Sequence, residues 1–212
     1  MRVVIAGGHG KIALELTRRL DERGDQVRSL IRNPDHAEEV RDAGALEAIV
    51  CDLEEADDDR VAEAVGEAEA VVFAAGAGPD SGSARKETMD YGGAVKLIEA
   101  ARHNHIHRYV IISSMGADPD HEGEETFDVY LRAKGKADRA VRESGLDYAI
   151  VKPGMLTDEP PTGKVEAGES VERGSIPRAD VAAVIALLLH DGGRERTIEV
   201  VGGDTPVERI LD

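Results

Sequence analysis

The chain has 212 residues, which is long enough for one well-buried α/β core but too short for that core plus a full second domain. Its 26 Lys and Arg residues against 43 Asp and Glu residues give a net charge of −17, which disfavours nucleic acid and anionic membrane surfaces as partners. A single cysteine, Cys51, excludes an intrachain disulfide and favours a reducing compartment, so we expect one cytoplasmic domain spanning residues 1–212.

The N-terminal residues MRVVIAGG enter an apolar run without the basic leader and cleavage site of an exported protein. No run approaches the roughly 18 apolar residues of a membrane helix. We therefore expect neither export nor membrane insertion. The acidic runs CDLEEADDD and HEGEE fit two interpretations: an ordinary acidic enzyme, or a protein adapted to high salt, where charge repulsion is screened.

Short β-rich runs alternate with helical patterns along the first half of the chain. Strands are predicted at 2–6, 26–31, 46–51 and 68–75, and helices at 11–24, 34–44, 58–66 and 86–102. Gly24 and Gly44 are expected to end the first two helices, and Pro34 to open the second.

The second half continues the alternation, with one interruption. Strands are predicted at 108–114, 147–154 and 196–203, and helices around 127–138 and at 177–190. Residues 156–175, rich in Pro, Gly and charge, are expected to form a loop with a short hairpin, and the last strand to close the sheet. Strands apolar on both faces and separated by long helices predict a doubly wound, mostly parallel α/β sheet of the Rossmann type, with about seven strands and helices on both faces.

The glycine-rich stretch GGHGKIA lies between the first predicted strand and the first helix. Gly7 and Gly10 allow a tight turn and a close approach of a pyrophosphate, which would lie at the positive end of the helix, and Ala13 stands where a third glycine often falls. A P-loop would need a longer loop and a hydroxyl residue after Lys11, where Ile12 stands. The context favours a dinucleotide site over a glycine turn with no ligand.

The second predicted strand ends in SLIRNP, without the acidic residue that usually accepts from the ribose 2′-hydroxyl of NAD. Arg32 stands there instead, and a guanidinium suits a 2′-phosphate. We therefore expect NADP rather than NAD. A surface arginine that makes no such contact is the alternative.

The stretch FDVYLRAKGKAD places Tyr130 and Lys134 four residues apart on one helix face. An ammonium about 5 Å from a tyrosine oxygen, at an effective dielectric near 20, would stabilise the phenolate by roughly 3 kcal/mol. Ser114, at the end of the fifth predicted strand, would hold a carbonyl oxygen at the sheet edge where such folds bind ligands. Taken singly, an ordinary helix-surface pair and a capping hydroxyl are the better interpretations; their joint occurrence after a nucleotide turn favours proton transfer.

Three histidines, His103, His105 and His107, alternate between the fourth predicted helix and the fifth strand. Imidazoles bind metals, but no acidic or thiol ligand adjoins them, so we expect a solvated connection and no metal.

In their order, these motifs resemble the short-chain dehydrogenase/reductases, specifically the small atypical branch of NmrA-like NAD(P)-binding proteins. The resemblance covers nearly the whole chain and rests on GGHGKIA, IRNP, CDL, FAAG, IISSMG, YLRAK, VKPG and IPRADVA. It implies a catalytic set of Ser114, Tyr130 and Lys134. It implies a cofactor site made of Gly7, His9, Gly10, Lys11, Ile12, Arg32, Asp52, Leu53, Ala74, Ala75, Gly76, Tyr130, Lys134, Pro153, Gly154 and Leu156, with the pair at 52 and 53 flanking the adenine and the last three near the nicotinamide.

The resemblance implies an NADP-dependent oxidoreductase acting on a small carbonyl, alcohol or quinone-like substrate, as a monomer or homodimer. The short chain argues against the substrate domain, and hence the activity, of sugar-nucleotide epimerases. Because this branch also contains dinucleotide-binding regulators without turnover, a regulatory or redox-sensing protein is the alternative, followed by a scaffold with a structural cofactor. Residues 78–86 and 156–175 are predicted to wall the substrate pocket.

Overall fold

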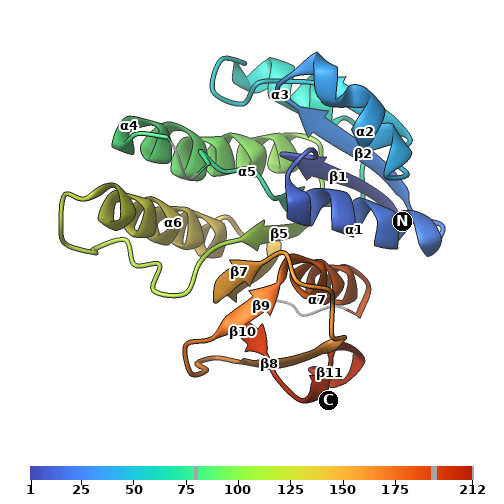
Figure 1. Ribbon diagram of the computed structural model, residues 1–212. Helices are drawn as coiled ribbons and strands as arrows, with labels where there is room; N and C mark the ends of the chain where they lie inside the picture. Colours follow the sequence, from blue (N-terminus) through green and yellow to red (C-terminus); the bar gives the residue numbers. More distant parts are fainter. Residues whose placement is uncertain (79–80, 192–194, 212) are drawn as a thin grey trace.

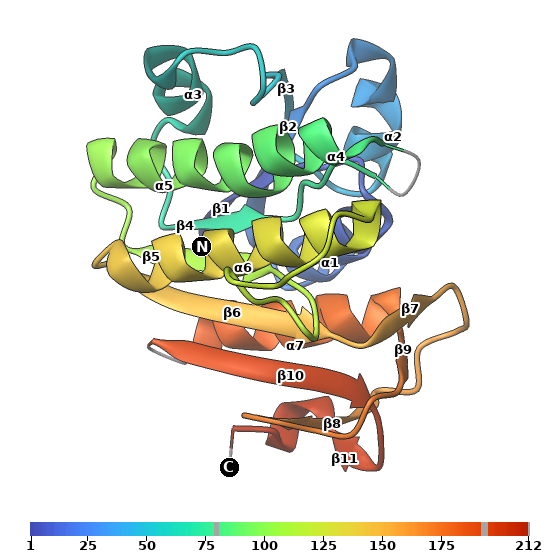
Figure 2. The ribbon, with the colours of Figure 1, turned by 90° about the vertical axis from the view of Figure 1, so that its left-hand side faces the viewer.

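A computed structural model describes residues 1–78, 81–191 and 195–211 of the chain. Figure 1 shows a central sheet with helices on both sides, and Figure 2 shows α5 and α6 running side by side across one face. The strands are β1 (Arg2–Ala6), β2 (Gln26–Ile31), β3 (Glu47–Val50), β4 (Ala70–Phe73), β5 (Arg108–Ile112), β6 (Asp147–Pro153), β7 (Met155–Thr157), β8 (Lys164–Gly168), β9 (Ser175–Pro177), β10 (Arg196–Gly202) and β11 (Thr205–Pro206). The helices are α1 (Lys11–Glu22), η1 (Pro34–His36), α2 (Ala37–Asp42), α3 (Asp58–Val65), α4 (Ser83–Arg85), η2 (Lys86–Gly93), α5 (Ala94–His103), α6 (Thr126–Glu143), α7 (Arg178–Asp191) and η3 (Val207–Arg209).

The strand order β3-β2-β1-β4-β5-β6 confirms the predicted doubly wound α/β sheet. These strands and β10 pair in parallel, and all seven coincide with predicted strands. Two short strands extend the sheet beyond β10, where β8 pairs antiparallel with β10 and β11 antiparallel with β8. Within the described residues the sheet therefore has nine strands, and the predicted terminal strand is an interior one.

The prediction of a short hairpin within residues 156–175 is wrong. The strand β7 pairs in parallel with β9 as a separate two-stranded sheet, while β8 between them joins the main sheet beside β10. The outer edge of β10 carries backbone donors and acceptors that need hydrogen-bond partners. The strand β8 provides these partners, although it is far from β10 in the sequence, and does not pair with its sequence neighbours β7 and β9. Val165 on β8 is fully buried as a result.

Two hydrophobic clusters lie on opposite faces of the sheet, and β1 contributes to both by the alternation of its side chains. Val3 and Ile5 belong to the cluster beneath α1, α2 and α7, whereas Val4 and Ala6 belong to the one beneath α3, α5 and α6. The helix pairs α1 and α7, α3 and α5, and α5 and α6 pack against each other. Both faces are therefore covered, and the carboxyl edge of the sheet is the place left for a ligand.

The helix predicted at residues 86–102 is not uniform. It begins as α4, widens into the π-helical turns of η2 and continues as α5. π-helical turns are rare and occur frequently at functional sites. Here they bury two charged side chains, Lys86 and Asp90, where η2 packs against α6.

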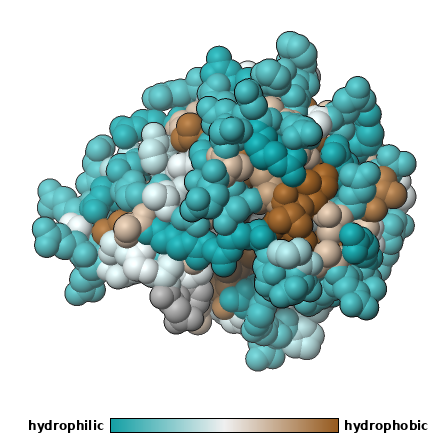
Figure 3. All heavy atoms as spheres, turned by 90° about the horizontal axis from the view of Figure 1, so that it is seen from above, coloured by the Kyte–Doolittle hydropathy of each residue, from teal (hydrophilic) through white to brown (hydrophobic). Residues whose placement is uncertain are grey.

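The face of the molecule on the side of α3 is largely hydrophilic. In Figure 3, which views that face, hydrophobic residues are confined to small areas between hydrophilic ones. Within the described ranges, no helix combines the length and apolar content needed to cross a bilayer.

A buried carboxylate, Asp25, ties the start of β2 to the N-terminus and to the end of α7. Its Oδ1 lies 2.7 Å from the N-terminal ammonium of Met1, and its Oδ2 lies 2.7 Å from Nε2 of His190 near the end of α7. Burial alone would raise the pKa of Asp25, but hydrogen bonds from the N-terminus and His190 outweigh it and lower that pKa.

We expect Asp25→Asn to lower the free energy of unfolding by about 1–3 kcal/mol, because charge-assisted hydrogen bonds are lost. The pKa of Asp25 is lower in the folded state, so its contribution is complete above the unfolded value near 3.9 and is lost as the pH falls through the folded value. Urea unfolding from pH 7 to pH 3 should show the difference from the native chain shrinking in acid. Glu22→Gln, at the exposed end of α1, is the control; a difference that is independent of pH would contradict the assignment.

Candidate dinucleotide and catalytic site

The glycine turn after β1 is clamped between the ends of two neighbouring strands. The amides of Gly7 and Gly8 both donate to the Leu30 carbonyl, at 3.1 and 3.0 Å. Gly7 has φ +79°, and a Cβ there would lie 2.5 Å from the Cα of Ala75. A Cβ on Gly8 would lie 2.5 Å from the Cβ of Ser29. Only glycine fits these two positions, and the exposed backbone of the turn is left close to whatever binds there.

The helix that follows offers an anion site. Gly10 is its extended N-cap, no side chain caps the helix, and no acidic residue stands in its first turn. The first-turn amides are therefore available to a phosphate at the positive end of a helix of 12 residues. Together with the glycine cradle, this is the arrangement a dinucleotide pyrophosphate requires, so the residues fit the predicted cofactor.

Lys11, at the start of α1, pairs with a carboxylate in the segment after β7. Its Nζ lies 2.6 Å from Oδ2 of Asp158, and Nη1 of Arg178 lies 2.6 Å from Oδ1 of the same carboxylate. The hydrogen bond from Lys11, with the charge of Arg178, lowers the pKa of Asp158. This exposed ion triad joins the starts of α1 and α7 through the segment after β7.

Four of the predicted cofactor residues, His9, Arg32, Asp52 and Leu53, line neither of the two pockets described below. The ring of His9 stacks on His36 with centroids 3.5 Å apart, and its Nε2 lies 2.7 Å from Oε2 of Glu39. Arg32 is exposed at the end of β2. Asp52 is half-buried, and its Oδ1 accepts from the Glu54 amide at 2.9 Å. Leu53 is buried.

Two pockets meet at Tyr130 on the carboxyl edge of the sheet. The first, of about 590 Å³, brings together the predicted residues Ile12, Ala74, Ala75, Gly76, Tyr130, Lys134 and Leu156. The second, of about 510 Å³, brings Ser114, Pro153 and Gly154 to the same tyrosine and leucine. The sequence motifs that follow β1, β4, β5 and β6 therefore converge in space with the motif on α6.

Lys134 is buried and anchored from two sides. Its Nζ donates to the Ile112 carbonyl at 3.0 Å, lies 3.2 Å from Oδ1 of Asp90, and is 5.9 Å from the centroid of the Tyr130 ring. Burial would lower the pKa of Lys134, but the Asp90 carboxylate outweighs it, and the pKa is raised. Lys134 is therefore an ammonium, and it is paired with a carboxylate that the sequence analysis did not consider.

The pocket residues that the sequence analysis missed include Asp90 from η2 and Ser113, the buried neighbour of Ser114 that lines both pockets. Lys86, also from η2, stood only within the predicted pocket wall. The sequence signal that could have found Asp90 is its spacing of four residues from Lys86, which places two charged side chains on one face of the predicted helix. For the serines, the doublet in IISS leaves open which hydroxyl faces the pocket, and Ser114 Oγ lies 3.2 Å from the Met115 carbonyl.

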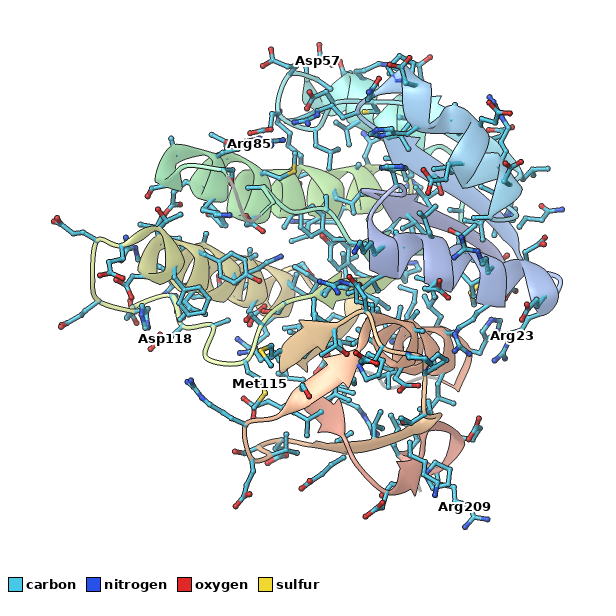
Figure 4. All side chains as sticks on the ribbon, in the orientation of Figure 1. Arg23, Asp57, Arg85, Met115, Asp118 and Arg209 are labelled. Atoms are coloured by element: carbon cyan, nitrogen blue, oxygen red, sulfur yellow. The ribbon has the colours of Figure 1, made fainter. Side chains whose placement is uncertain are left out.

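Some residues of the two predicted pocket walls, 78–86 and 156–175, line the pockets in the structure. Gly78 and Lys86 line the first pocket, while residues 79 and 80 of the predicted wall lie outside the described residues. From the other wall, Leu156 and Arg173 line the second pocket. Met115 lines it too, on the segment that leads from β5 toward α6, labelled with Asp118 in Figure 4.

The alternating histidines contribute nothing to either pocket. His103 and His105 border a shallow surface hollow beside α3. Over residues 1–78, 81–191 and 195–211, no three His, Cys, Asp or Glu side chains are placed to hold a metal ion.

A glycine cradle before a bare helix N-terminus, on a sheet of order 3-2-1-4-5-6, defines a Rossmann-type dinucleotide-binding protein. The chain belongs to the NAD(P)H-binding family, whose model matches residues 7–192. This confirms the predicted family and its NAD(P)-binding character; the choice between the two cofactors stays a prediction.

Several relatives match over nearly their whole length. The chain is 35% identical to the "Uncharacterized sugar epimerase YhfK" of Bacillus subtilis, over 100% of this chain and 99% of that protein. It is 39% identical to a solved structure from Bacillus halodurans, named as a candidate NAD-dependent epimerase/dehydratase, with a TM-score of 0.92 over 100% and 98% of the two chains. The oxidoreductase ylbE of Lactococcus lactis is 26% identical, with a TM-score of 0.85 over 100% and 95%.

We expect Gly7→Ala to weaken NADPH binding at least tenfold, because the new Cβ would displace Ala75 in the segment after β4 and open the cradle. Gly24→Ala is the matched control, since Gly24 also has a positive φ, +83°, but a Cβ there meets nothing within 4 Å. Both changes should cost about 1–2 kcal/mol of stability for the backbone conformation. Calorimetric titration with NADPH should separate them; equal affinities for the two variants would contradict the cradle.

Proposed function

We propose that the protein is an NADP-dependent oxidoreductase that reduces a small carbonyl or quinone-like substrate. The observation that carries the proposal is the shared pocket: Tyr130 and Lys134 line the same cavity as Ile12 of the cofactor turn and residues 74–76 after β4. An acid of the protein therefore lies beside the channel that a nicotinamide would enter.

Bound NADPH would supply the hydride to the carbonyl carbon. The Tyr130 hydroxyl would donate its proton to the carbonyl oxygen, leaving a phenolate that takes a proton back from solvent. Ser113 or Ser114 would hold that oxygen by a hydroxyl hydrogen bond, and the ammonium groups near the ring would stabilise the phenolate. The apolar, half-buried side chain of Leu156, which lines both pockets, would limit the access of water.

Arg32 supports the preference for NADP. It stands at the end of β2, and no acidic residue follows that strand until Asp35. An exposed guanidinium there is free to form paired hydrogen bonds with a 2′-phosphate.

Two alternatives share the same cofactor site. The names of the B. subtilis and B. halodurans relatives refer to epimerases, in which the cofactor would be regenerated and no net NADPH consumed. A regulatory protein would bind the dinucleotide without turnover. The tyrosine in the pocket favours turnover over regulation. Net consumption of NADPH distinguishes the proposed reductase from an epimerase. The proposal includes a small-molecule substrate, a monomer or homodimer, and no nucleic-acid or membrane partner.

We expect Tyr130→Phe to lower NADPH oxidation with a carbonyl and quinone panel by about 100-fold or more, because the proton donor is lost. Cofactor affinity should stay nearly unchanged. Tyr91→Phe is a matched control, since a lysine, Lys136, also lies over the Tyr91 ring, at 5.8 Å, and Tyr91 lines neither pocket. Turnover that survives in Tyr130→Phe would reject the assigned acid, and a native chain with no turnover on any substrate would favour the regulatory alternative.

We expect Arg32→Ala to weaken NADPH binding about 10- to 100-fold and to leave NADH binding unchanged, because only NADPH carries the 2′-phosphate. Fluorescence titration with each nucleotide measures both affinities. Arg41→Ala, on the exposed side of α2, controls for the loss of one positive charge from this acidic chain. An equal loss for both nucleotides would exclude the 2′-phosphate contact.

A further inference from the structure

The second pocket extends beyond the residues predicted for the cofactor. Ile12 and residues 74–76 of the cofactor site line the first pocket only. The second pocket is lined in part by residues that belong to neither the predicted cofactor site nor the predicted catalytic set, among them Met115, Phe127, Met155 and Arg173. This part of the pocket, beside Tyr130, is therefore the space in which a substrate would lie.

Large apolar side chains are exposed at this pocket. Within the described residues, four large apolar side chains are exposed. Phe127, at 63%, and Met155, at 72%, both line the second pocket, whereas Leu46 and Val50 lie at the two ends of β3. A bound apolar group would remove the pocket pair from water, which is favourable. The gathering of this pair at one pocket indicates a ligand with an apolar body.

The apolar surface suits a flat ring. The rings of Phe127 and Tyr130 lie 5.9 Å apart between centroids, with 27° between their planes, so their faces are roughly parallel. Aromatic groups pack on such faces in offset stacks, and a thioether such as that of Met155 makes favourable contacts with a ring. An aromatic carbonyl compound would lay its ring against Phe127 and bring its oxygen to the Tyr130 hydroxyl.

The charged side chains of the second pocket are all cations. Over the described residues, Arg173 and Arg178 line it and no Asp or Glu does. Arg178 is already paired with Asp158, at 2.6 Å between Nη1 and Oδ1. Arg173 is exposed, and no carboxylate of the described part of the chain lies within ion-pair distance of it. In a chain with a net charge of −17, such an arginine is available to an anionic group of a ligand.

Backbone contacts place Arg173 beside the exposed apolar pair. The Gly174 carbonyl accepts from the Met155 amide at 2.9 Å, which ties the loop of Arg173 to the start of β7. The guanidinium of Arg173 extends toward the segment after β5, where its Nη2 would lie 3.7 Å from a Cβ on Gly116. The cation and the apolar side chains therefore border the same pocket.

We propose that the substrate is a flat aromatic carbonyl compound that carries a carboxylate or sulfonate group, with its ring against Phe127 and Met155 and its anionic group paired with Arg173. This inference rests on the proposed reductase and narrows its substrate class. Hydride passes from NADPH to the carbonyl carbon and the Tyr130 proton passes to the carbonyl oxygen, which gives an alcohol and NADP⁺. The anionic group is unchanged, so Arg173 determines specificity and takes no part in the chemical step.

The test begins with binding, measured without turnover. The probes are 2-naphthoate and its neutral methyl ester, which share one two-ring frame and carry no aldehyde or ketone. Saturating NADP⁺ keeps both probes out of the cofactor site. Fluorescence titration should show 2-naphthoate binding about tenfold more tightly than the ester, as expected for one charge-assisted pair. Equal affinities, or tighter binding of the ester, would overturn the inference.

Variants of Arg173 assign the preference to one side chain. Arg173→Gln should weaken 2-naphthoate about tenfold and change the ester by less than about twofold. Arg173→Lys, which keeps the charge, should retain part of the preference, and Arg173→Glu should reverse it. Arg139→Gln is the matched control, because Arg139 is exposed on α6 and lines neither pocket. A preference that survives Arg173→Gln would overturn the assignment.

The apolar part of the inference has its own variant. Phe127→Ala should weaken 2-naphthoate and its ester alike, by about tenfold, because both lose the same ring contact. Loss of affinity for the carboxylate alone would overturn the ring contact. Circular dichroism checks that each variant keeps the native fold.

Turnover separates this inference from the proposed function. With NADPH, 6-formyl-2-naphthoate should show a KM about tenfold below that of its methyl ester, and Arg173→Gln should raise that KM about tenfold with kcat nearly unchanged. A fall in kcat at constant KM would overturn the role assigned to Arg173. The expected binding preference in a chain that reduces neither aldehyde would support an anionic aromatic ligand at this pocket while the reductase proposal fails.

Discussion

The site depends on one constraint of topology, the reversal of strand order between β1 and β4. The chain winds outward from β1 to β3 and then returns to place β4 on the other side of β1. The segments after these two strands leave the sheet toward opposite faces, which opens a crevice at its carboxyl edge. The close approach of Gly7 to Ala75 marks the floor of that crevice. The pocket residues reach the crevice from strand ends, from helices packed beside it and from the loops that follow β4 and β8.

The buried charges of the pocket are costly for folding. Burying an ammonium removes its hydration at an effective penalty of several kcal/mol, and an apolar residue of similar size would often be at least as stable. The chain nevertheless buries Lys86, Lys134 and Asp90 together. Asp90 offsets the cost of Lys134, whereas the contacts of Lys86 among the residues that the structure describes are a carbonyl and the face of an aromatic ring. Such an arrangement is difficult to explain by stability and is consistent with a site that uses charge.

How much the sequence predicts follows from the range of the forces involved. The Tyr130 and Lys134 spacing and the glycine turn are local patterns with a fixed period, so both were placed correctly within the fold. The partner of β8 is set by the free edge of β10, which no local pattern records. The pairing of Asp90 with Lys134 needs two helices and a π-helical widening to be known at once. Ordinary helix periodicity gives no reason to expect that widening.

The overall charge of the chain and the charge of its crevice have opposite signs, and the two act over different distances. A net charge of −17 repels an anionic dinucleotide from afar, but beyond about 10 Å that repulsion is largely screened at 0.1 M salt. Inside the crevice, the lysines and arginines lie against low-dielectric walls, where screening by salt is weaker. Salt therefore removes more of the repulsion than of the attraction. An acidic surface is compatible with an anionic cofactor because the cations are gathered where the cofactor would bind.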